Sequence, residues 1–182
     1  MWPSCPECGF ALVSTSQNTG QTIIPREEFE PRMTIRVVPV TAENFSPYGQ
    51  LIIASETYGR QSFSAGLSHD HRPVALSTTH VRAVQLPITL EQIERHPFSS
   101  QTFLPMEVSR WVVVVSVSPE LSDIRGFMVG PGVGVTIGRG IWHYQLTALD
   151  SDAKFVVLMW KDHSTDEEIV SIPPIELAAP SN

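Results

Sequence analysis

Short apolar runs rich in β-branched residues recur along most of the chain, and they constrain its fold more than any other feature. Each run is about four to eight residues long and most are bounded by Gly, Pro, Ser or Asp, as strands joined by turns are. They cover residues 34–40, 51–54, 74–79, 81–86, 102–106, 111–117, 126–129, 133–137, 144–149 and 154–160. No window holds the dozen or so helical residues that a crossover between parallel strands needs. The sequence therefore predicts an all-β antiparallel sandwich or closed barrel.

Helical signal is weak and confined to short segments. Residues 41–48 and 90–95 can each form two turns, and residues 164–170 begin with a capping residue and an acidic first turn. We expect short helices at the periphery of the β-structure. Residues 111–115, Trp-Val-Val-Val-Val, are apolar on both alternating faces. That pattern is typical of a strand buried between two layers.

The 182 residues suffice for one domain and a short extra segment. Residues 1–32 are rich in proline and lack periodicity, so we expect a flexible N-terminal extension before a folded domain over residues 33–182. Cys5 and Cys8 lie in this extension without the second pair that a zinc ribbon needs. No cysteine follows Cys8, which favours a reducing, cytoplasmic compartment.

Charge and hydropathy exclude two classes of partner. The net charge is −7, and the 12 Lys and Arg residues are scattered rather than clustered as a nucleic-acid groove requires. The longest apolar run, residues 111–115, is far shorter than the roughly 20 residues that cross a bilayer. We therefore expect neither a nucleic acid nor a membrane as partner.

One candidate site segment contains Glu94-Arg-His-Pro97 and then Ser100-Gln-Thr-Phe-Leu-Pro-Met106. Pro97 disfavours helical geometry at His96, which places this histidine at a chain reversal before a strand. Gln101 and Phe103 then share one face of that strand. A histidine and an amide there can converge on the mouth of a pocket.

Two further segments carry histidines. Gly138-Arg-Gly-Ile-Trp-His143 places His143, suited to acid–base chemistry or metal binding, beside two glycines that allow a barrel corner. His69-Asp-His-Arg72 offers two imidazoles that would face the same way on a strand and could bind one metal ion, although the segment also fits a polar loop.

These motifs occur in an order that resembles the ureidoglycolate lyase family of cupin-fold enzymes. The matching segments are Phe45-Ser-Pro-Tyr-Gly49, both parts of the His96 segment, Leu121-Ser-Asp-Ile-Arg-Gly-Phe127 and the segment from Gly134 to His143. The resemblance covers about residues 34–172. It implies a double-stranded β-helix barrel, commonly a homodimer, that cleaves (S)-ureidoglycolate to glyoxylate and urea during allantoin and purine breakdown.

The resemblance also suggests which residues act. It implies His143, His96 and Gln101 as catalytic residues, with His143 as the acid–base group. Arg72 or Arg139 would bind the substrate carboxylate, and Trp142 would form an apolar wall. No cofactor is firmly implied, although a divalent metal ion fits a cupin. Many bacterial members read His-Arg-x-x-Trp-His-His-Pro where this chain has Gly138, Tyr144 and Gln145 in place of two histidines and the proline.

Three alternatives remain open at this point. A diverged cupin could act as a lyase, isomerase or dehydratase on another small oxygenated metabolite. A barrel that binds a small ligand without turnover is a second alternative. Metal-dependent chemistry through His69, His71 and His143 is a third.

Overall fold

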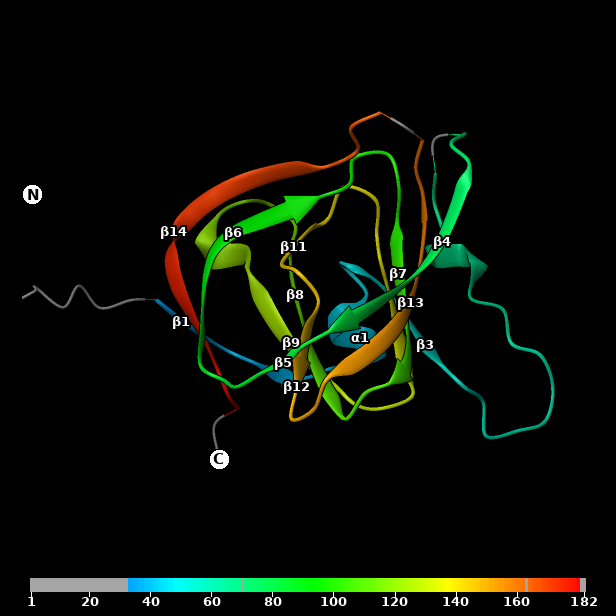
Figure 1. The fold of residues 1–182 in the computed structure, drawn as a ribbon, viewed down its shortest axis with the longest axis horizontal. Coiled ribbons are helices and arrows are strands. Elements are labelled where there is room, and N and C mark those ends of the chain that lie inside the picture. Colours follow the sequence, from blue (N-terminus) through cyan, green and yellow to red (C-terminus); the bar gives the residue numbers. More distant parts are fainter. Residues whose placement is uncertain (1–32, 70, 163, 181–182) are drawn as a thin grey trace, which may run out of the picture. The chain divides into compact units, whose positions relative to one another are not determined.

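The computed structural model describes residues 33–69, 71–162 and 164–180, and these form two β-sheets that wrap into a barrel (Figure 1). The strands are β1 (Thr34–Arg36), β2 (Val38–Pro39), β3 (Gly49–Ile53), β4 (Val74–Val81), β5 (Ala83–Val84), β6 (Ile88–Arg95), β7 (Gln101–Glu107), β8 (Arg110–Ser116), β9 (Arg125–Val129), β10 (Val133–Ile137), β11 (Trp142–His143), β12 (Thr147–Leu149), β13 (Ala153–Trp160) and β14 (Glu168–Ala178). The predicted extension, with Cys5 and Cys8, lies outside the described residues.

Three successive arms of the chain produce the barrel. The first arm along the chain, β6 to β8, lies between the other two in space and is called the middle arm below. It pairs antiparallel along its length with the second arm, β9 to β11, so that β8 meets β9, β7 meets β10 and β6 meets β11. The third arm follows the other side of the middle arm, where β12, β13 and β14 pair antiparallel with β8, β7 and β6. This is a double-stranded β-helix, so the predicted cupin-type fold is confirmed.

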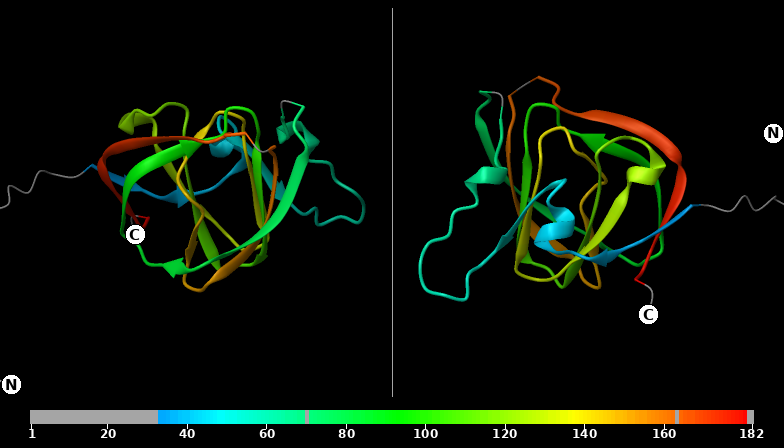
Figure 2. Two further views of the ribbon diagram at one scale, coloured as in Figure 1. Left: turned by 45° about the horizontal axis from the view of Figure 1, so that its top comes forward. Right: turned by 180° about the vertical axis from the view of Figure 1, so that it is seen from behind.

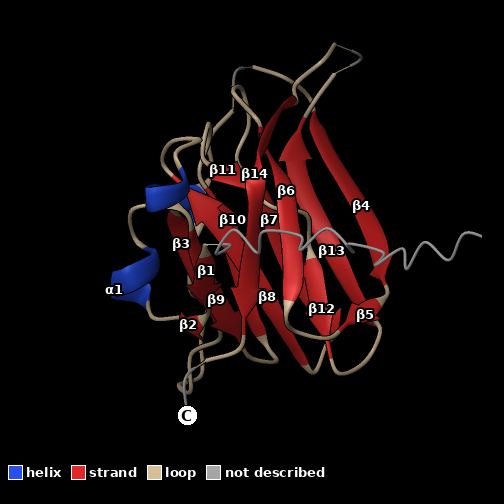
Figure 3. Cartoon of the chain, turned by 90° about the vertical axis from the view of Figure 1, so that its left-hand side faces the viewer, coloured by secondary structure: helices blue, strands red, loops and turns tan. Residues whose placement is uncertain are grey.

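The two sheets differ in size and in strand order. The larger follows the order β1-β14-β6-β11-β8-β12-β5, with β9 also on β8 and β2 on β9. The smaller follows β3-β10-β7-β13-β4. Their strands run side by side in Figure 3, and Figure 2 shows the barrel from two further directions. A loop of only five residues, 96–100, joins the end of β6 in the larger sheet to the start of β7 in the smaller sheet. These two strand ends therefore lie close together.

The apolar strand β8 separates two hydrophobic cores. Trp111, Val113 and Val115 pack in the first core with residues from both sheets, including Phe155, whose ring lies 5.0 Å from that of Trp111. Val112 and Val114 face the other way. They pack in a second core formed by residues of β1, β6, β11 and β14. The prediction that both faces of this segment are buried is confirmed.

Of the three predicted helices, the one over residues 41–48 is present in shortened form and the other two are absent. The only α-helix among the described residues is α1 (Ala42–Phe45), whose N-cap Thr41 forms a capping box with Asn44; η1 (Ser64–Gly66) and η2 (Leu121–Asp123) are single 3₁₀ turns. The helices predicted over residues 90–95 and 164–170 are wrong: the first is the end of β6, and the second leads into β14. Both segments pair with each other, so cross-strand hydrogen bonds override weak local helix propensity. No helix of the described chain combines the length and apolar character needed to span a membrane.

Close backbone packing at Gly49 gives a test of the barrel. A Cβ added at Gly49 would lie 1.9 Å from the carbonyl oxygen of Thr136 on the neighbouring strand β10, whereas one at Gly130 would meet nothing within 4 Å. We expect Gly49→Ala to lower the free energy of unfolding by about 2 kcal/mol or more. Gly130→Ala is the matched control and should change it little. Chemical denaturation measures both, and equal losses would contradict the described packing of β3 on β10.

Candidate active site

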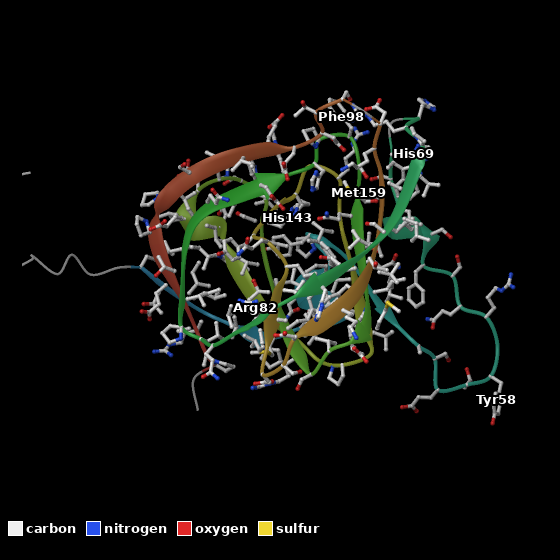
Figure 4. The ribbon with its side chains drawn as sticks, in the orientation of Figure 1. Tyr58, His69, Arg82, Phe98, His143 and Met159 are labelled. Carbon is white, nitrogen blue, oxygen red and sulfur yellow. The ribbon has the colours of Figure 1, made fainter. Side chains whose placement is uncertain are left out.

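The register between β6 and β11 brings a carboxylate to a buried imidazole. His143 on β11 pairs with Glu94 on β6, and its Nε2 atom lies 3.4 Å from Oε1 of Glu94. The His143 side chain is 2% exposed and lies between the strands in Figure 4. No well-aligned hydrogen bond joins the two groups, because Nε2 of His143 has no hydrogen-bond partner. The contact is therefore mainly electrostatic.

A second imidazole completes the cluster. His96 directly follows β6 and is two residues beyond Glu94, so the extended chain carries both side chains on one face. The ring centroids of His96 and His143 are 5.3 Å apart, and His96 is 7% exposed. Nε2 of His96 also lacks a hydrogen-bond partner. The structure thus brings together the two histidines on which the predicted site depends.

Backbone carbonyl groups orient both rings. Nδ1 of His96 lies 2.7 Å from the carbonyl oxygen of Asp166, and Nδ1 of His143 lies 3.1 Å from that of Ile141. A carbonyl oxygen only accepts hydrogen bonds, so each Nδ1 donates. In the neutral ring this leaves the lone pair on Nε2, the atom that faces the cluster. Both rings are therefore arranged to accept a proton or bind a cation.

Glu94 is the most accessible member of the cluster, and its surroundings keep it ionised. The polar contact with His143 is the largest influence and lowers the pKa of Glu94, while partial burial raises it and the charges of His143 and His96 lower it further. The net result is a pKa below the ordinary value for a glutamate. At neutral pH the group is a carboxylate beside two imidazoles.

Gln101 contributes an unpaired amide at the start of β7. It pairs with Ile137 on one side and Met159 on the other. Alternation along β7 places it on the same face as Phe103, which belongs to the first core. Its Oε1 atom is buried without a hydrogen-bond partner. Gln101 and Phe103 thus lie on one face of the strand, as the sequence predicts.

The structure does not place the other predicted residues in the cluster. Trp142 packs in the second core, on the face of β11 opposite His143, with the Arg95 guanidinium 4.6 Å from its ring. Arg72 lies 3.8 Å from carboxylate oxygens of both Asp162 and Asp166. Arg139 is exposed on a turn whose next residue, Gly140, donates a backbone hydrogen bond to the carbonyl oxygen of His96.

The alternative histidine pair is assembled differently. His69 stacks on Trp160 with ring centroids 5.2 Å apart, and its Nδ1 accepts a hydrogen bond from the backbone of His71. Asp70, between them, lies outside the described residues. Among the residues that the structure describes, the group suited to hold a metal ion is Glu94, His96 and His143, whose ligand atoms lie within 4.8 Å of one another.

Glu94 is the site residue that sequence reasoning missed. It was expected on a helix over residues 90–95, where its side chain would have no fixed relation to His96. On a strand, the spacing Glu-x-His puts the two side chains on one face. The Glu-x-His spacing of Glu94-Arg-His96 therefore indicates a shared site, but only once this segment is known to be a strand.

A hollow on another part of the barrel lacks such groups. A hollow of about 410 Å³ is lined by Ile52, Ala54, Ser55, Gly59, Gln61, Phe63, Leu104, Pro105, Gly132 and Gly134. None of these residues carries a charged or imidazole side chain, so the hollow has no group for acid–base chemistry. The unpaired polar atoms place the candidate active site at the two histidines instead.

A family profile described as ureidoglycolate lyase matches residues 32–177. The chain belongs to the ureidoglycolate lyase family. The ureidoglycolate lyase of Escherichia coli strain SMS-3-5 is 33% identical over 161 residues, which cover 80% of this chain and 98% of that protein. The enzyme of the same name from Shigella boydii serotype 18 is 32% identical over the same coverage.

Solved structures show only distant similarity. An oxalate decarboxylase of Bacillus subtilis is 17% identical, with a TM-score of 0.39 over 74% of this chain and 29% of that one. A 3,4-ketoisomerase from Helicobacter canadensis is 14% identical, with a TM-score of 0.38 over 50% of this chain and 66% of that one.

Two of the departures from the bacterial motif of this family, Tyr144 and Gln145, lie away from the cluster. Tyr144 packs against the second core, on the side of Trp142 rather than of His143. Gln145 is exposed, and its side chain donates a hydrogen bond to the hydroxyl group of Tyr144. The replaced histidine and proline therefore alter the outside of this corner and leave the Glu94, His96 and His143 cluster intact.

Two imidazole nitrogens and a carboxylate form a donor set that suits divalent transition-metal ions. We expect the full-length protein to bind Mn²⁺, chosen because Cys5 and Cys8 would compete for zinc, and His96→Ala to weaken binding about 10-fold or more. His69→Ala is the control and should retain full affinity. Titration followed by electron paramagnetic resonance measures free Mn²⁺. Loss of binding only in His69→Ala would assign the ion to the other histidine pair.

Proposed function

We propose that this protein is a ureidoglycolate lyase, which cleaves (S)-ureidoglycolate to urea and glyoxylate in the breakdown of allantoin and hence of purines. Membership of the family supports the reaction, and one structural observation supports the site. Nε2 of His96, Nε2 of His143 and Oε1 of Gln101 are all buried and unpaired. Buried polar atoms are rarely left unpaired, so a polar ligand is the natural partner for all three.

The substrate's chemistry defines what the site must do. In ureidoglycolate a hydroxyl group and a ureido nitrogen share one carbon, next to a carboxylate. Elimination removes the hydroxyl proton, forms the carbon–oxygen double bond of glyoxylate and breaks the carbon–nitrogen bond. The departing nitrogen takes up a proton and leaves as urea. A group that accepts the first proton and returns it to the nitrogen therefore suffices for both transfers.

Glu94 and His143 together can carry this proton. Oε1 of Glu94 and Nε2 of His143 are 3.4 Å apart, so a proton received by one of the two groups is close enough to be shared with the other. The lowered pKa of Glu94 keeps its carboxylate ionised at neutral pH, where it stabilises a protonated His143. The Glu94 side chain is 26% exposed against 2% for His143, which supports Glu94 as the group that meets the substrate first.

The cluster also fits a divalent ion, since two lone pairs on Nε2 atoms converge beside a carboxylate. His96 and His143, with Glu94 within reach, would hold such an ion. When bound it would supply Lewis-acid chemistry, polarising the hydroxyl oxygen of the substrate. Glu94 would move the proton, while His96 and His143 would hold the ion beside it.

Arg139 is our candidate for the substrate carboxylate. Among the described residues Arg139 has no carboxylate within ion-pair distance, whereas Arg72 already faces two. Arg139 also lies on the turn that is hydrogen-bonded to the backbone of His96. A guanidinium group there can bind a carboxylate with two parallel hydrogen bonds. Gln101 would accept a hydrogen bond from the ureido group.

Activity measurements test the proposal directly. Full-length protein given racemic ureidoglycolate should release glyoxylate and urea in equal amounts. His143→Ala should lower kcat/KM at least about 100-fold, the usual contribution of an acid–base group. The exposed His80 provides the control, because His80→Ala should leave turnover unchanged. Thermal stabilisation by glyoxylate without product release would instead indicate a protein that binds a small ligand without turnover. Turnover of another small acid in place of ureidoglycolate would indicate a diverged lyase.

We also propose a homodimer in the cytoplasm. The absence of cysteine after Cys8 suits a reducing compartment. Among the described strands, β4 is an edge of the smaller sheet. Its residues Val74 and Leu76 are 61% and 72% exposed, and Leu76 lies opposite Leu158 of β13. An uncovered apolar edge strand is a favourable place for a second copy to pair.

Analytical ultracentrifugation tests this assembly. The full chain should sediment as a dimer of about twice 20.1 kDa, and Leu76→Lys should shift it to the monomer because it buries a charge at the contact. Val38→Lys changes a valine that is 45% exposed on β2 and should leave the dimer intact. A dimer that survives Leu76→Lys would place the interface on another surface.

A further inference from the structure

Three loops meet at the end of the barrel that holds His96. Residues 96–100 connect β6 to β7, the described residues 161–162 and 164–167 lie between β13 and β14, and the described residues 67–69 and 71–73 precede β4. Hydrogen bonds join the first and last of these loops, where the backbone N–H of Ser100 donates to the carbonyl oxygen of Ser68 and the hydroxyl group of Ser100 accepts from the N–H of Ser68. His69 and Phe98 mark this end in Figure 4. The loop over residues 161–167 must be fixed here as well, because its carbonyl group at Asp166 orients His96.

Asp166 is buried where its loop meets the His96 loop. Its side chain is 5% exposed, and Oδ1 accepts a hydrogen bond of 3.1 Å from the backbone N–H of Phe98. Its own carbonyl oxygen accepts the 2.7 Å hydrogen bond from Nδ1 of His96. One residue therefore contacts both the His96 ring and the backbone two residues beyond it. A shift of Asp166 would move the ring and the turn that carries it.

Arg72 holds Asp166 from the third loop. Its Nη1 atom is buried, makes no hydrogen bond and lies 3.8 Å from Oδ1 of Asp166, so this contact is an ion pair, and its Cζ atom lies 4.2 Å from the centroid of the Phe98 ring. Its side chain is only 13% exposed, so the positive charge needs a nearby anion. Asp162 lies on the surface of the loop that carries Asp166, and its Oδ1 atom is also 3.8 Å from Nη1 of Arg72. Arg72 is thus surrounded by structural partners.

We propose that Asp166 is a positioning residue for His96, fixed by Arg72 and the N–H of Phe98. Through its carbonyl oxygen it keeps the proton of His96 on Nδ1 and the lone pair on Nε2, facing Glu94 and His143. This inference rests on the proposed role of His96 in the lyase site. In this proposal Arg72 acts through Asp166, a role that differs from the binding of the substrate carboxylate that the sequence suggested.

The position of the His96 proton tests the inference without any turnover. In full-length protein labelled with ¹⁵N-histidine, two-bond ¹H–¹⁵N correlation spectra should show wild-type His96 protonated on Nδ1. Asp166→Ala should produce mixed tautomers at His96 while His143, held by Ile141, stays unchanged. The same variant should lower kcat about 10- to 100-fold with little change in KM, the usual effect of losing a group that orients a site histidine.

Matched variants separate positioning from general destabilisation. Asp162→Ala removes the other carboxylate near Arg72 but no contact with His96, so tautomer and kcat should stay at wild-type values. Asp166→Asn keeps an oxygen for the N–H of Phe98 and should restore most of the tautomer order lost in Asp166→Ala. If Asp166→Ala does not fold, Arg72→Gln, which weakens the same anchor, should show the mixed tautomers.

Two results would overturn the inference. One is a His96 tautomer that is unchanged in folded Asp166→Ala, or in Arg72→Gln where the alanine variant fails to fold. The other is an equal effect of Asp162→Ala on the tautomer. Failure of the proposed function is distinguishable, because the wild-type protein would then release no urea while the tautomer measurements could still follow the expected pattern.

Discussion

The antiparallel register of β6 with β11 is the constraint on which the site depends. It places His143 opposite Glu94 and closes the barrel at the point where the middle arm of the chain leaves the larger sheet. His96 follows in the same strand direction, two residues along, and so joins the pair. A slip of one residue would reverse the faces of β11, sending the His143 ring into the second core and Trp142 into the cluster.

Two apolar cores hold this register in place. Trp142 and His143 are adjacent but serve opposite sides of β11, one packed among aliphatic side chains and the other facing polar groups. A one-residue slip would place the Trp142 indole among polar groups and the His143 imidazole in the apolar second core, and both changes cost free energy. The hydrophobic packing therefore determines where the cluster of Glu94, His96 and His143 forms, although none of its apolar side chains belongs to that cluster.

Backbone carbonyl groups provide a second kind of organisation. Both histidines donate from Nδ1 to a carbonyl oxygen, which turns both Nε2 atoms toward Glu94. For His143 this oxygen belongs to Ile141, two residues away, so the local turn suffices. For His96 it belongs to Asp166, which is 70 residues away in sequence, so a separate loop must be fixed for the ring to be oriented. Ion pairing with Arg72 provides that fixation.

The sequence by itself determined the all-β class and most strands, and it indicated His96, His143 and Gln101 as candidate site residues. These depend on local patterns, such as alternating apolar residues and a proline after His96, or on motifs whose order resembles a known family. Only the tertiary structure revealed that residues 90–95 form a strand, that Glu94 lies beside both histidines, that Arg72 lies near the carboxylates of Asp162 and Asp166, and that Trp142 packs in the second core. Short segments have similar local preferences for helix and strand, so partners distant in sequence decide between them. The same holds for a charged side chain, because the nearest opposite charge is set by the fold rather than by its neighbours in the chain.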